Sequence, residues 1–435
     1  MPRPTQLPAP RFELTEHTLD NGLRVVVAPD RTAPVVGVAV LYDVGIRSEP
    51  QGRGGFAHLF EHLMFQGSAH LDKLEHFRYV QSSGGTFNGS THLDYTDYFE
   101  ALPSNALERG LFLEADRMLA PRITAENLAN QLEVVKNEIR VNVLNRPYGG
   151  FPWIYLPDVL FDSFANSHNG YGGFEDLENA TVEDARDFFA RYYAPANAVL
   201  AVAGDLDADD TLALVERHFG GIKKRRAPKR PSFAEAPLSA ERRAMHNDPH
   251  APIPAVAIGY RVPDPVASLD EHLAGILLAE VLSDGDASRL QVRLVQRDHL
   301  VTDIGAYLGE FGDPFDERDP TAFTITAHYP EAASLDAILR AVDEELSRIA
   351  EDGLDPGELG RGRTRLTSVL LRQMDSVLSR TLTFAKFELV YGRAGLVAEL
   401  PGRLAAVSED AVRAAAAALH PSRRAVLELV AGGGR

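Results

Sequence analysis

The chain has 435 residues, and at roughly 100 to 200 residues per domain it has room for two to four domains. Its 45% hydrophobic and 24% charged residues exclude a fibrous or wholly disordered protein. The net charge of −18 disfavours nucleic acid as a partner, and the absence of cysteine excludes disulfides, thiolate metal sites and a cysteine nucleophile. Because no apolar run approaches the roughly 18 residues that span a bilayer, we expect a cytoplasmic protein with no membrane partner.

The N-terminal part of the chain predicts a sheet followed by helices. Segments 12–19 and 23–28 flank the turn Asp20-Asn21-Gly22, which is a strong hairpin signal, and a third strand is expected at 35–44. A further strand is expected at 95–101. The spacing of apolar residues predicts helices at 56–66, 73–81, 106–119, 125–143 and 182–192.

The two halves of the chain contain similar segments at matching places. Ala198-Val199-Leu200 in the first half and Ala425-Val426-Leu427 in the second each follow a predicted helix. The strands expected at 35–44 and 255–261 also occupy matching places, and each is followed by a helix. Duplication of an α+β unit is the simplest explanation of these parallels.

A basic run that contains proline, residues 223–231, lies near the middle of this acidic chain. We interpret it as a solvated linker, since the net charge and the lack of interleaved aromatic residues disfavour a nucleic-acid patch. The predicted architecture is two homologous α+β domains, 1–222 and 237–435, joined by a linker at 223–236. Each domain is expected to be a mostly antiparallel sheet with helices packed on one face.

A possible metal site lies in the first predicted helix, which contains His58-Leu59-Phe60-Glu61-His62. Residues four apart share a helix face, so both imidazoles can bind one metal ion, with Glu61 beside them. This layout is typical of zinc hydrolases, in which a carboxylate acts as general base on a water that the metal activates. The alternative is a pair of hydrogen-bonded histidines on a half-buried helix.

A third ligand must come from another segment, and the helix predicted at 125–143 offers Glu133 and Glu138. Both stand within an otherwise apolar pattern, and a carboxylate beside a buried stripe needs a partner. The residue types alone leave the choice open between these two, and a surface position is the alternative for either.

These motifs resemble the pitrilysin family of metallopeptidases, and within it the bacterial chains related to the mitochondrial processing peptidase β subunit. The resemblance rests on the inverted zinc motif at His58-Glu61-His62, on the segment 130–138 and on Asn145-Arg146-Pro147-Tyr148-Gly149. It implies that His58, His62 and Glu138 bind one zinc ion per chain and that Glu61 is the general base. It also implies a zinc endopeptidase that acts on short or unfolded peptides.

The same resemblance concerns residues around the metal. It implies that Asn88, Gly89 and Ser90 lie on an edge strand that pairs with an extended peptide substrate. Many relatives have a second Glu seven residues before the zinc-binding one, and this chain has Gln131 there. We expect Gln131 to support a zinc ligand by a hydrogen bond instead of a charge. The lone Trp153 is interpreted as a packing residue, with substrate contact as the alternative.

A second departure from the family lies in the C-terminal half. Self-sufficient relatives carry an Arg and a Tyr there that hold the peptide, and the matching positions here are Val295 and Thr302. Arg297 and Tyr307 are the alternative under a shifted alignment. We therefore expect a heterodimer in which a paralogue without the zinc motif supplies the Arg/Tyr clamp. The competing hypothesis is a non-catalytic scaffold subunit of the same fold.

Overall fold

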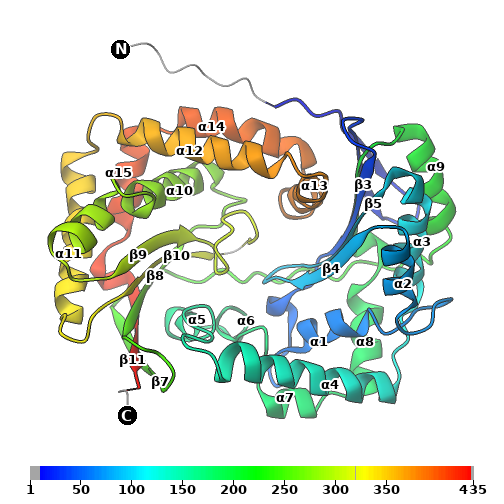
Figure 1. The fold of residues 1–435 in the computed structure, drawn as a ribbon, viewed down its shortest axis with the longest axis horizontal. Coiled ribbons are helices and arrows are strands. Elements are labelled where there is room, and N and C mark those ends of the chain that lie inside the picture. Colours follow the sequence, from blue (N-terminus) through cyan, green and yellow to red (C-terminus); the bar gives the residue numbers. More distant parts are fainter. Residues whose placement is uncertain (1–9, 319, 433–435) are drawn as a thin grey trace.

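The computed structural model describes residues 10–318 and 320–432, and it contains two sheets that face one another across the middle of the molecule (Figure 1). None of the helices in these residues is long and apolar enough to cross a membrane. The two-domain α+β fold expected from the sequence is confirmed.

The first sheet has six strands in the order β1-β2-β6-β3-β5-β4. All neighbours are antiparallel except β2 and β6. β4 pairs only with β5 and so forms one edge of the sheet, as expected for Asn88, Gly89 and Ser90. The strands are β1 Thr15–Thr18, β2 Arg24–Pro29, β3 Val35–Tyr42, β4 Thr86–Thr91, β5 Thr96–Pro103 and β6 Ala198–Gly204.

The second sheet repeats this arrangement with one strand fewer. Its order is β7-β11-β8-β10-β9, and its one parallel pair, β11 with β7, matches β6 with β2 in the first sheet. This shared topology is what duplication of one unit produces. The strands are β7 Arg242–Asp248, β8 Ala255–Val262, β9 Asp303–Leu308, β10 Thr321–His328 and β11 Arg424–Ala431.

The helices of the first half begin close to the predicted positions. Thr124 caps α4, since its side chain accepts a hydrogen bond from the backbone of Asn127. The helix expected to reach residue 143 leaves α geometry earlier, because Arg140–Leu144 forms a wider π-helical turn. The helices are α1 Phe56–Leu63, α2 Glu75–Ser82, α3 Leu107–Leu119, α4 Ala125–Ile139, α5 Leu156–Leu160, α6 Phe164–Ser167, α7 Phe174–Glu178, α8 Val182–Tyr192 and α9 Ala208–Phe219.

Each sheet carries helices of its own half on one face and a helix of the other half on the opposite face (Figure 1). α13 packs on β3 and β6 of the first sheet, and α5 packs on β8 and β11 of the second. Gly37 of β3 permits the first contact, since a Cβ there would lie 2.3 Å from Oγ1 of Thr381. The helices of the second half are α10 Leu269–Ser283, α11 Leu335–Asp352, α12 Glu358–Gln373, α13 Val377–Tyr391, α14 Leu400–Ala406 and α15 Glu409–Ala418.

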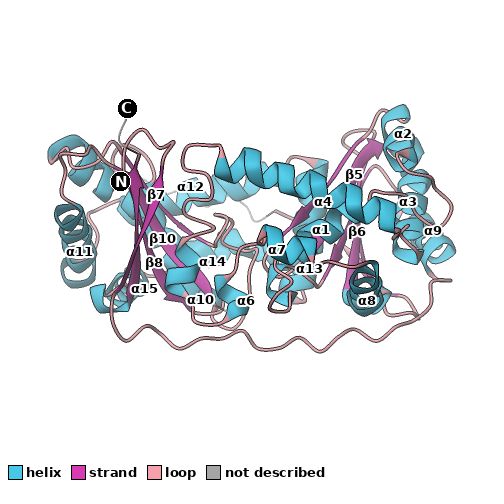
Figure 2. Ribbon diagram, turned by 90° about the horizontal axis from the view of Figure 1, so that it is seen from below, coloured by secondary structure: helices cyan, strands magenta, loops and turns pink. Residues whose placement is uncertain are grey.

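The segment 223–236 contains no helix or strand and runs between the two halves as a long connection (Figure 2). The expectation that it is simply solvated is wrong at two of its arginines. Arg230 donates to the buried carboxylate of Asp94 at 2.6 Å, and Arg225 donates to the backbone oxygen of Tyr193 at 2.6 Å. Its positive charges therefore compensate buried acceptors of the first half.

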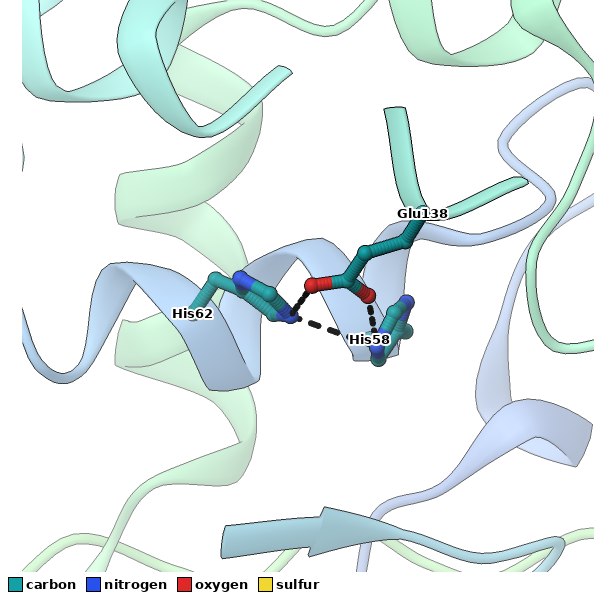
Figure 3. Close-up of side chains that lie close together, drawn as sticks. All are labelled: His58, His62 and Glu138. Atoms are coloured by element: carbon teal, nitrogen blue, oxygen red, sulfur yellow. Dashed lines mark hydrogen bonds and ion pairs between the residues drawn. The ribbon is translucent and has the colours of Figure 1, made fainter. Parts of the chain in front are cut away.

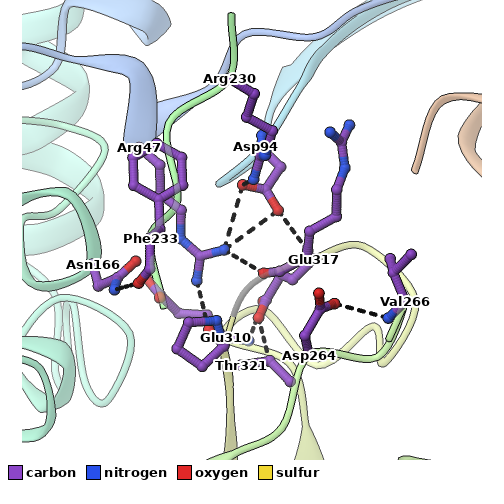
Figure 4. A network of polar contacts seen from close by, with 12 residues as sticks. Arg47, Asp94, Asn166, Arg230, Phe233, Asp264, Val266, Glu310, Glu317 and Thr321 are labelled. Atoms are coloured by element: carbon purple, nitrogen blue, oxygen red, sulfur yellow. Dashed lines mark hydrogen bonds and ion pairs between the residues drawn. The ribbon is translucent and has the colours of Figure 1, made fainter. Parts of the chain in front are cut away.

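A buried charged network joins the two halves near this connection (Figure 4). Arg47 lies 3.3 Å from Asp94 and also donates to backbone oxygens of Arg318 and Pro320 in the second half. Burial alone would raise the pKa of Asp94, but the guanidinium groups of Arg47, Arg230 and Arg318 outweigh it and hold that pKa below its usual value. The halves thus share ion pairs as well as helices.

Candidate active site

The first α-helix of the chain, α1, presents its polar face to the space between the two halves. Its apolar residues Leu59, Phe60 and Leu63 are fully buried in the core of the first half. Its N-terminus is held by the buried carboxylate of Glu49, which accepts hydrogen bonds from the backbone of Gly55 and Ala57. An acid at this end is favourable, because the helix dipole is positive there.

Three side chains from α1 and α4 converge on one point (Figure 3). Nε2 of His58 lies 3.3 Å from Nε2 of His62, and the Glu138 carboxylate oxygens lie 3.7 and 3.6 Å from these nitrogens. Ligand atoms around a tetrahedral zinc ion with bonds near 2.1 Å stand about 3.4 Å apart. Two imidazoles and one carboxylate therefore fit zinc, and they leave one position for water or substrate.

The two candidate carboxylates of α4 point to different places. Glu138 reaches the histidines, whereas Glu133 accepts a hydrogen bond from Lys136 at 2.9 Å on the outer surface of the helix. A spacing of five residues turns side chains to different faces of a helix, which is why only one can reach α1. The geometry favours Glu138 as the third ligand.

Gln131, on α4, contacts His62 and is only 6% exposed. Its Oε1 is 3.3 Å from Nδ1 of His62, and its Nε2 donates to Asn130. If Oε1 accepts a hydrogen bond from a protonated Nδ1, the lone pair of Nε2 is free to point at the convergence centre. This is the orientation that the hydrogen-bonding role expected of Gln131 requires.

Glu61 lies beside this group and is only 9% exposed. Its Oε2 accepts a hydrogen bond of 2.6 Å from the hydroxyl of Thr91 on β4. Burial raises the pKa of the Glu61 carboxyl to about 7, and burial together with the nearby His62 lowers the pKa of His58 to about 3. His58 is thus a neutral imidazole, the form that binds metal, and a cation bound there would lower the pKa of Glu61 again.

A cavity of about 560 Å³ opens beside these residues and is lined by both halves. Gly89 and Ser90 of the expected substrate strand line it, whereas Asn88 is exposed and does not. A second cavity of about 660 Å³ shares four lining residues with the first, so the two form one continuous groove. The shared residues are Pro152, Trp153, Tyr171 and Tyr307.

Four residues of the second half were considered for the peptide clamp, and one of them lines the cavity. Val295 packs against the core of the second half, and the hydroxyl of Thr302 donates to the backbone oxygen of His328. Arg297 is exposed and pairs with Asp298, while Tyr307 lines the cavity. Among the described residues no Arg or Lys lines the first cavity, whereas Arg146 of the first half lines the second.

Several cavity residues were missed or left open by the sequence. The ring centroid of Trp153 lies 5.6 Å from that of Tyr171 and 6.2 Å from that of Phe311. The Tyr171 ring in turn lies 5.0 Å, centroid to centroid, from the ring of His58. Thr91 directly follows the expected substrate strand, so its place in the sequence was a usable signal. No pattern marked Tyr171 or Phe311, because their place depends on how the loops fold.

A second group of possible metal ligands, His76, Glu100 and Glu114, is buried behind β5. The guanidinium of Arg117 pairs with Glu114 there, so an internal cation already compensates the acid. Among the described residues no Arg or Lys pairs with Glu138, so the group at His58 is the better candidate for zinc.

Comparison with known families matches both halves of the chain. A model described as Insulinase (Peptidase family M16) matches residues 24–147, and one described as Peptidase M16 inactive domain matches residues 179–366. The zinc protease PqqE of Helicobacter pylori is 27% identical over 370 residues, covering 82% of this chain and 80% of that protein. The uncharacterized zinc protease YmxG of Bacillus subtilis is 23% identical over 406 residues, covering 92% and 94%.

Solved structures agree with these matches. A protease from Helicobacter pylori superimposes with a TM-score of 0.87 at 25% identity, covering 96% of this chain and all of that one. The periplasmic protease PqqL of Escherichia coli gives 0.77 at 19% identity, covering 98% of this chain and 48% of that one. Matches on both halves, in sequence and in structure, show that the chain has the two-domain fold of the M16 (insulinase) peptidase family.

Proposed function

We propose that this chain is a zinc-dependent endopeptidase that hydrolyses short or unfolded peptides. The observation that carries the proposal is the convergence of His58, His62 and Glu138 beside a groove, with Glu61 adjacent. One zinc ion per chain is proposed to bind these three ligands. The finer resemblance to the mitochondrial processing peptidase β subunit and the cytoplasmic location stay predictions.

The residues of the chain suggest how such a reaction proceeds. Zinc, when bound, supplies positive charge that polarises the peptide carbonyl and eases deprotonation of water. Glu61 is proposed to accept the proton of the attacking water on its carboxylate and to return it to the departing amine. Gln131 is proposed to keep His62 in the tautomer whose Nε2 binds the metal.

The substrate is proposed to bind as an extended strand. β4 is an edge strand with unpaired backbone groups, and Gly89 and Ser90 on it line the cavity next to Glu61. A folded protein cannot offer such a segment, whereas a short or unfolded peptide can. The net charge of −18 would favour basic segments through long-range attraction.

The second half supports a proposal of two subunits. Tyr307 supplies one phenol to the groove, but among the described residues of the second half no Arg or Lys lines either cavity, so that half would hold a peptide weakly. A paralogue without the zinc motif would supply the missing Arg/Tyr clamp. The alternative, a non-catalytic scaffold, is disfavoured because all four residues of the zinc motif are present and close together.

Replacing Glu61 by Gln tests the proposed mechanism. The amide keeps the shape of the side chain but cannot accept a proton, so zinc content should be unchanged while peptide hydrolysis falls about a thousandfold. Metal analysis measures the zinc content, and cleavage of a quenched fluorescent peptide measures the rate of hydrolysis. Substantial hydrolysis by a zinc-loaded Glu61→Gln protein would remove Glu61 from the mechanism.

A further inference from the structure

The last residue of β4, Thr91, makes the closest polar contact to the proposed base. Its hydroxyl donates to Oε2 of Glu61 at 2.6 Å, and within the described residues this is the one hydrogen bond that the carboxylate receives. Glu61 also lines the cavity, so its side chain remains accessible from that side. One carboxylate oxygen is therefore tied to β4 while the group still faces the groove.

The backbone that carries Thr91 is held firmly. Thr91 pairs with Thr96 across the β4–β5 hairpin, and the next residue, His92, donates its backbone N–H to Tyr95 at 2.8 Å. The backbone oxygen of His92 accepts a hydrogen bond of 3.0 Å from the backbone of Ile46. The His92 ring stacks on the ring of Tyr95, with 4.2 Å between the ring centroids. A hydroxyl on such a fixed turn can restrict the side chain that it bonds.

β4 also confines Glu61 by close approach. A Cβ added at Gly89 would lie 3.3 Å from Cγ of Glu61, so the strand passes directly against the stem of that side chain. Because β4 passes this near to the stem and Thr91 donates to Oε2, few alternative rotamers of Glu61 would keep the hydrogen bond.

We propose that Thr91 is a positioning residue: its hydroxyl fixes the rotamer of Glu61, so that the other carboxylate oxygen faces the water to be deprotonated. The inference rests on the proposed function and deepens it. Because β4 is also the proposed substrate strand, the element that would bind the peptide backbone also sets the position of the base.

The first test compares Thr91→Val with Thr91→Ser in a peptide-cleavage assay of the most active form, alone or with its partner. Valine keeps the shape without the hydroxyl, so kcat should fall roughly 10- to 100-fold, with KM and zinc content nearly unchanged. Serine keeps the hydroxyl and should restore kcat to within about threefold. Thr18→Val, an exposed position on β1 at the opposite edge of the same sheet, is the matched control and should behave as wild type.

A second test uses the metal-free protein and needs no activity. Thr91→Val should lower the urea midpoint of unfolding when Glu61 is present and leave it unchanged in a Glu61→Ala background, because the buried carboxylate then no longer loses a donor. Equal shifts in both backgrounds, or a Thr91→Val protein with the wild-type kcat, would overturn the inference. A wild-type protein that binds zinc but cleaves no peptide would instead overturn the proposed function, since the unfolding test judges the contact separately.

Discussion

The two sheets share one strand order, yet the helices that follow their equivalent strands differ in character. After β3 comes α1, whose His58 and Glu61 line the groove and whose His62 lies beside His58. After β8 comes α10, which is buried on nearly every side and packs against α12, α14 and α15. Its one histidine, His272, has its Nε2 2.6 Å from the backbone oxygen of Pro314. Among the described residues this histidine has no hydrogen bond to a carboxylate.

This difference shows what the duplication allows. A helix that is covered on all sides must be apolar, whereas one that borders a cavity can carry polar side chains. Extra helices cover α10 in the second half, and the matching side of α1 is left open. The first copy can therefore hold the chemistry, while the second supplies wall residues such as Tyr307 and Phe311.

The sharpest test of this division is removal of the third ligand in the first half. Glu138→Ala should abolish stoichiometric zinc binding, weakening it more than 100-fold, because two imidazoles alone make an incomplete site. Glu133→Ala is the matched control on the same helix, and it should cost only the surface pair with Lys136. Metal analysis after dialysis measures both. Loss of zinc from Glu133→Ala with retention by Glu138→Ala would reverse the assignment.

The halves are also joined through the half-buried imidazole of His92, and replacing this residue tests that link. Its Nδ1 lies 3.0 Å from Asp316 in the second half and its Nε2 lies 3.3 Å from Asp97, while Tyr95 and Lys386 also contact Asp316. Burial alone would lower the pKa of His92, but the two carboxylates outweigh it and raise that pKa to about 10. His92→Gln removes the cation beside Asp97 and leaves Asp316 with Lys386 alone, and it should cost roughly 3 kcal/mol of unfolding free energy.

The pH dependence of that loss identifies its cause. A group whose pKa rises on folding contributes stability that is complete below its unfolded pKa and is lost as pH rises towards its folded pKa. The advantage of wild type over His92→Gln should therefore be greatest below about pH 6.5 and shrink towards pH 10. Urea unfolding of both proteins across this range measures it. A difference that does not vary with pH would mean that His92 acts by packing alone.

The proposed dependence on a partner tests whether the second half is sufficient. The purified chain should bind zinc but cleave peptides feebly, with activity rising about 100-fold when the paralogue is added, because a poorly held scissile bond reacts slowly. Activity is measured at a concentration where the chain is shown to be free of partners. Full activity from the single chain would indicate that Tyr307 and the other lining residues hold the peptide unaided.

Much of this organisation could be predicted from local sequence patterns. The hairpin at Asn21-Gly22, the echoed Ala-Val-Leu strands and the spacing of His58 and His62 each depend on residues close together in the chain. The packing of α13 on β3 could not, since it brings Thr381 to Gly37 across most of the chain. Nor could the place of Tyr307, because the sequence alone allows the clamp tyrosine to correspond to Thr302 or to Tyr307.

The exchanged helices offer the last and smallest test of the comparison, since a glycine marks the contact in each half. A Cβ on Gly37 would lie 2.3 Å from Oγ1 and 3.1 Å from Cβ of Thr381, atoms close to the backbone of α13. A Cβ on Gly259 would meet the ends of two leucine side chains, Leu156 at 3.0 Å and Leu160 at 3.2 Å. The Oγ1 and Cβ atoms of a threonine are held close to the helix backbone and cannot move aside, whereas the end of a leucine side chain can rotate away.

Gly37→Ala should therefore destabilise the protein by about 2 kcal/mol and Gly259→Ala by less than about 1 kcal/mol. Gly360→Ala is a suitable control, since a Cβ on this helical residue meets nothing within 4 Å and alanine favours the helix. Denaturant unfolding of the three variants ranks them. Equal costs for Gly37→Ala and Gly259→Ala would mean that α13 shifts on its sheet as readily as a leucine changes rotamer. The exchanged helix would then be a loose cover of the first sheet, and the ion pairs at Asp94 and His92 would be the contacts that hold the two halves together.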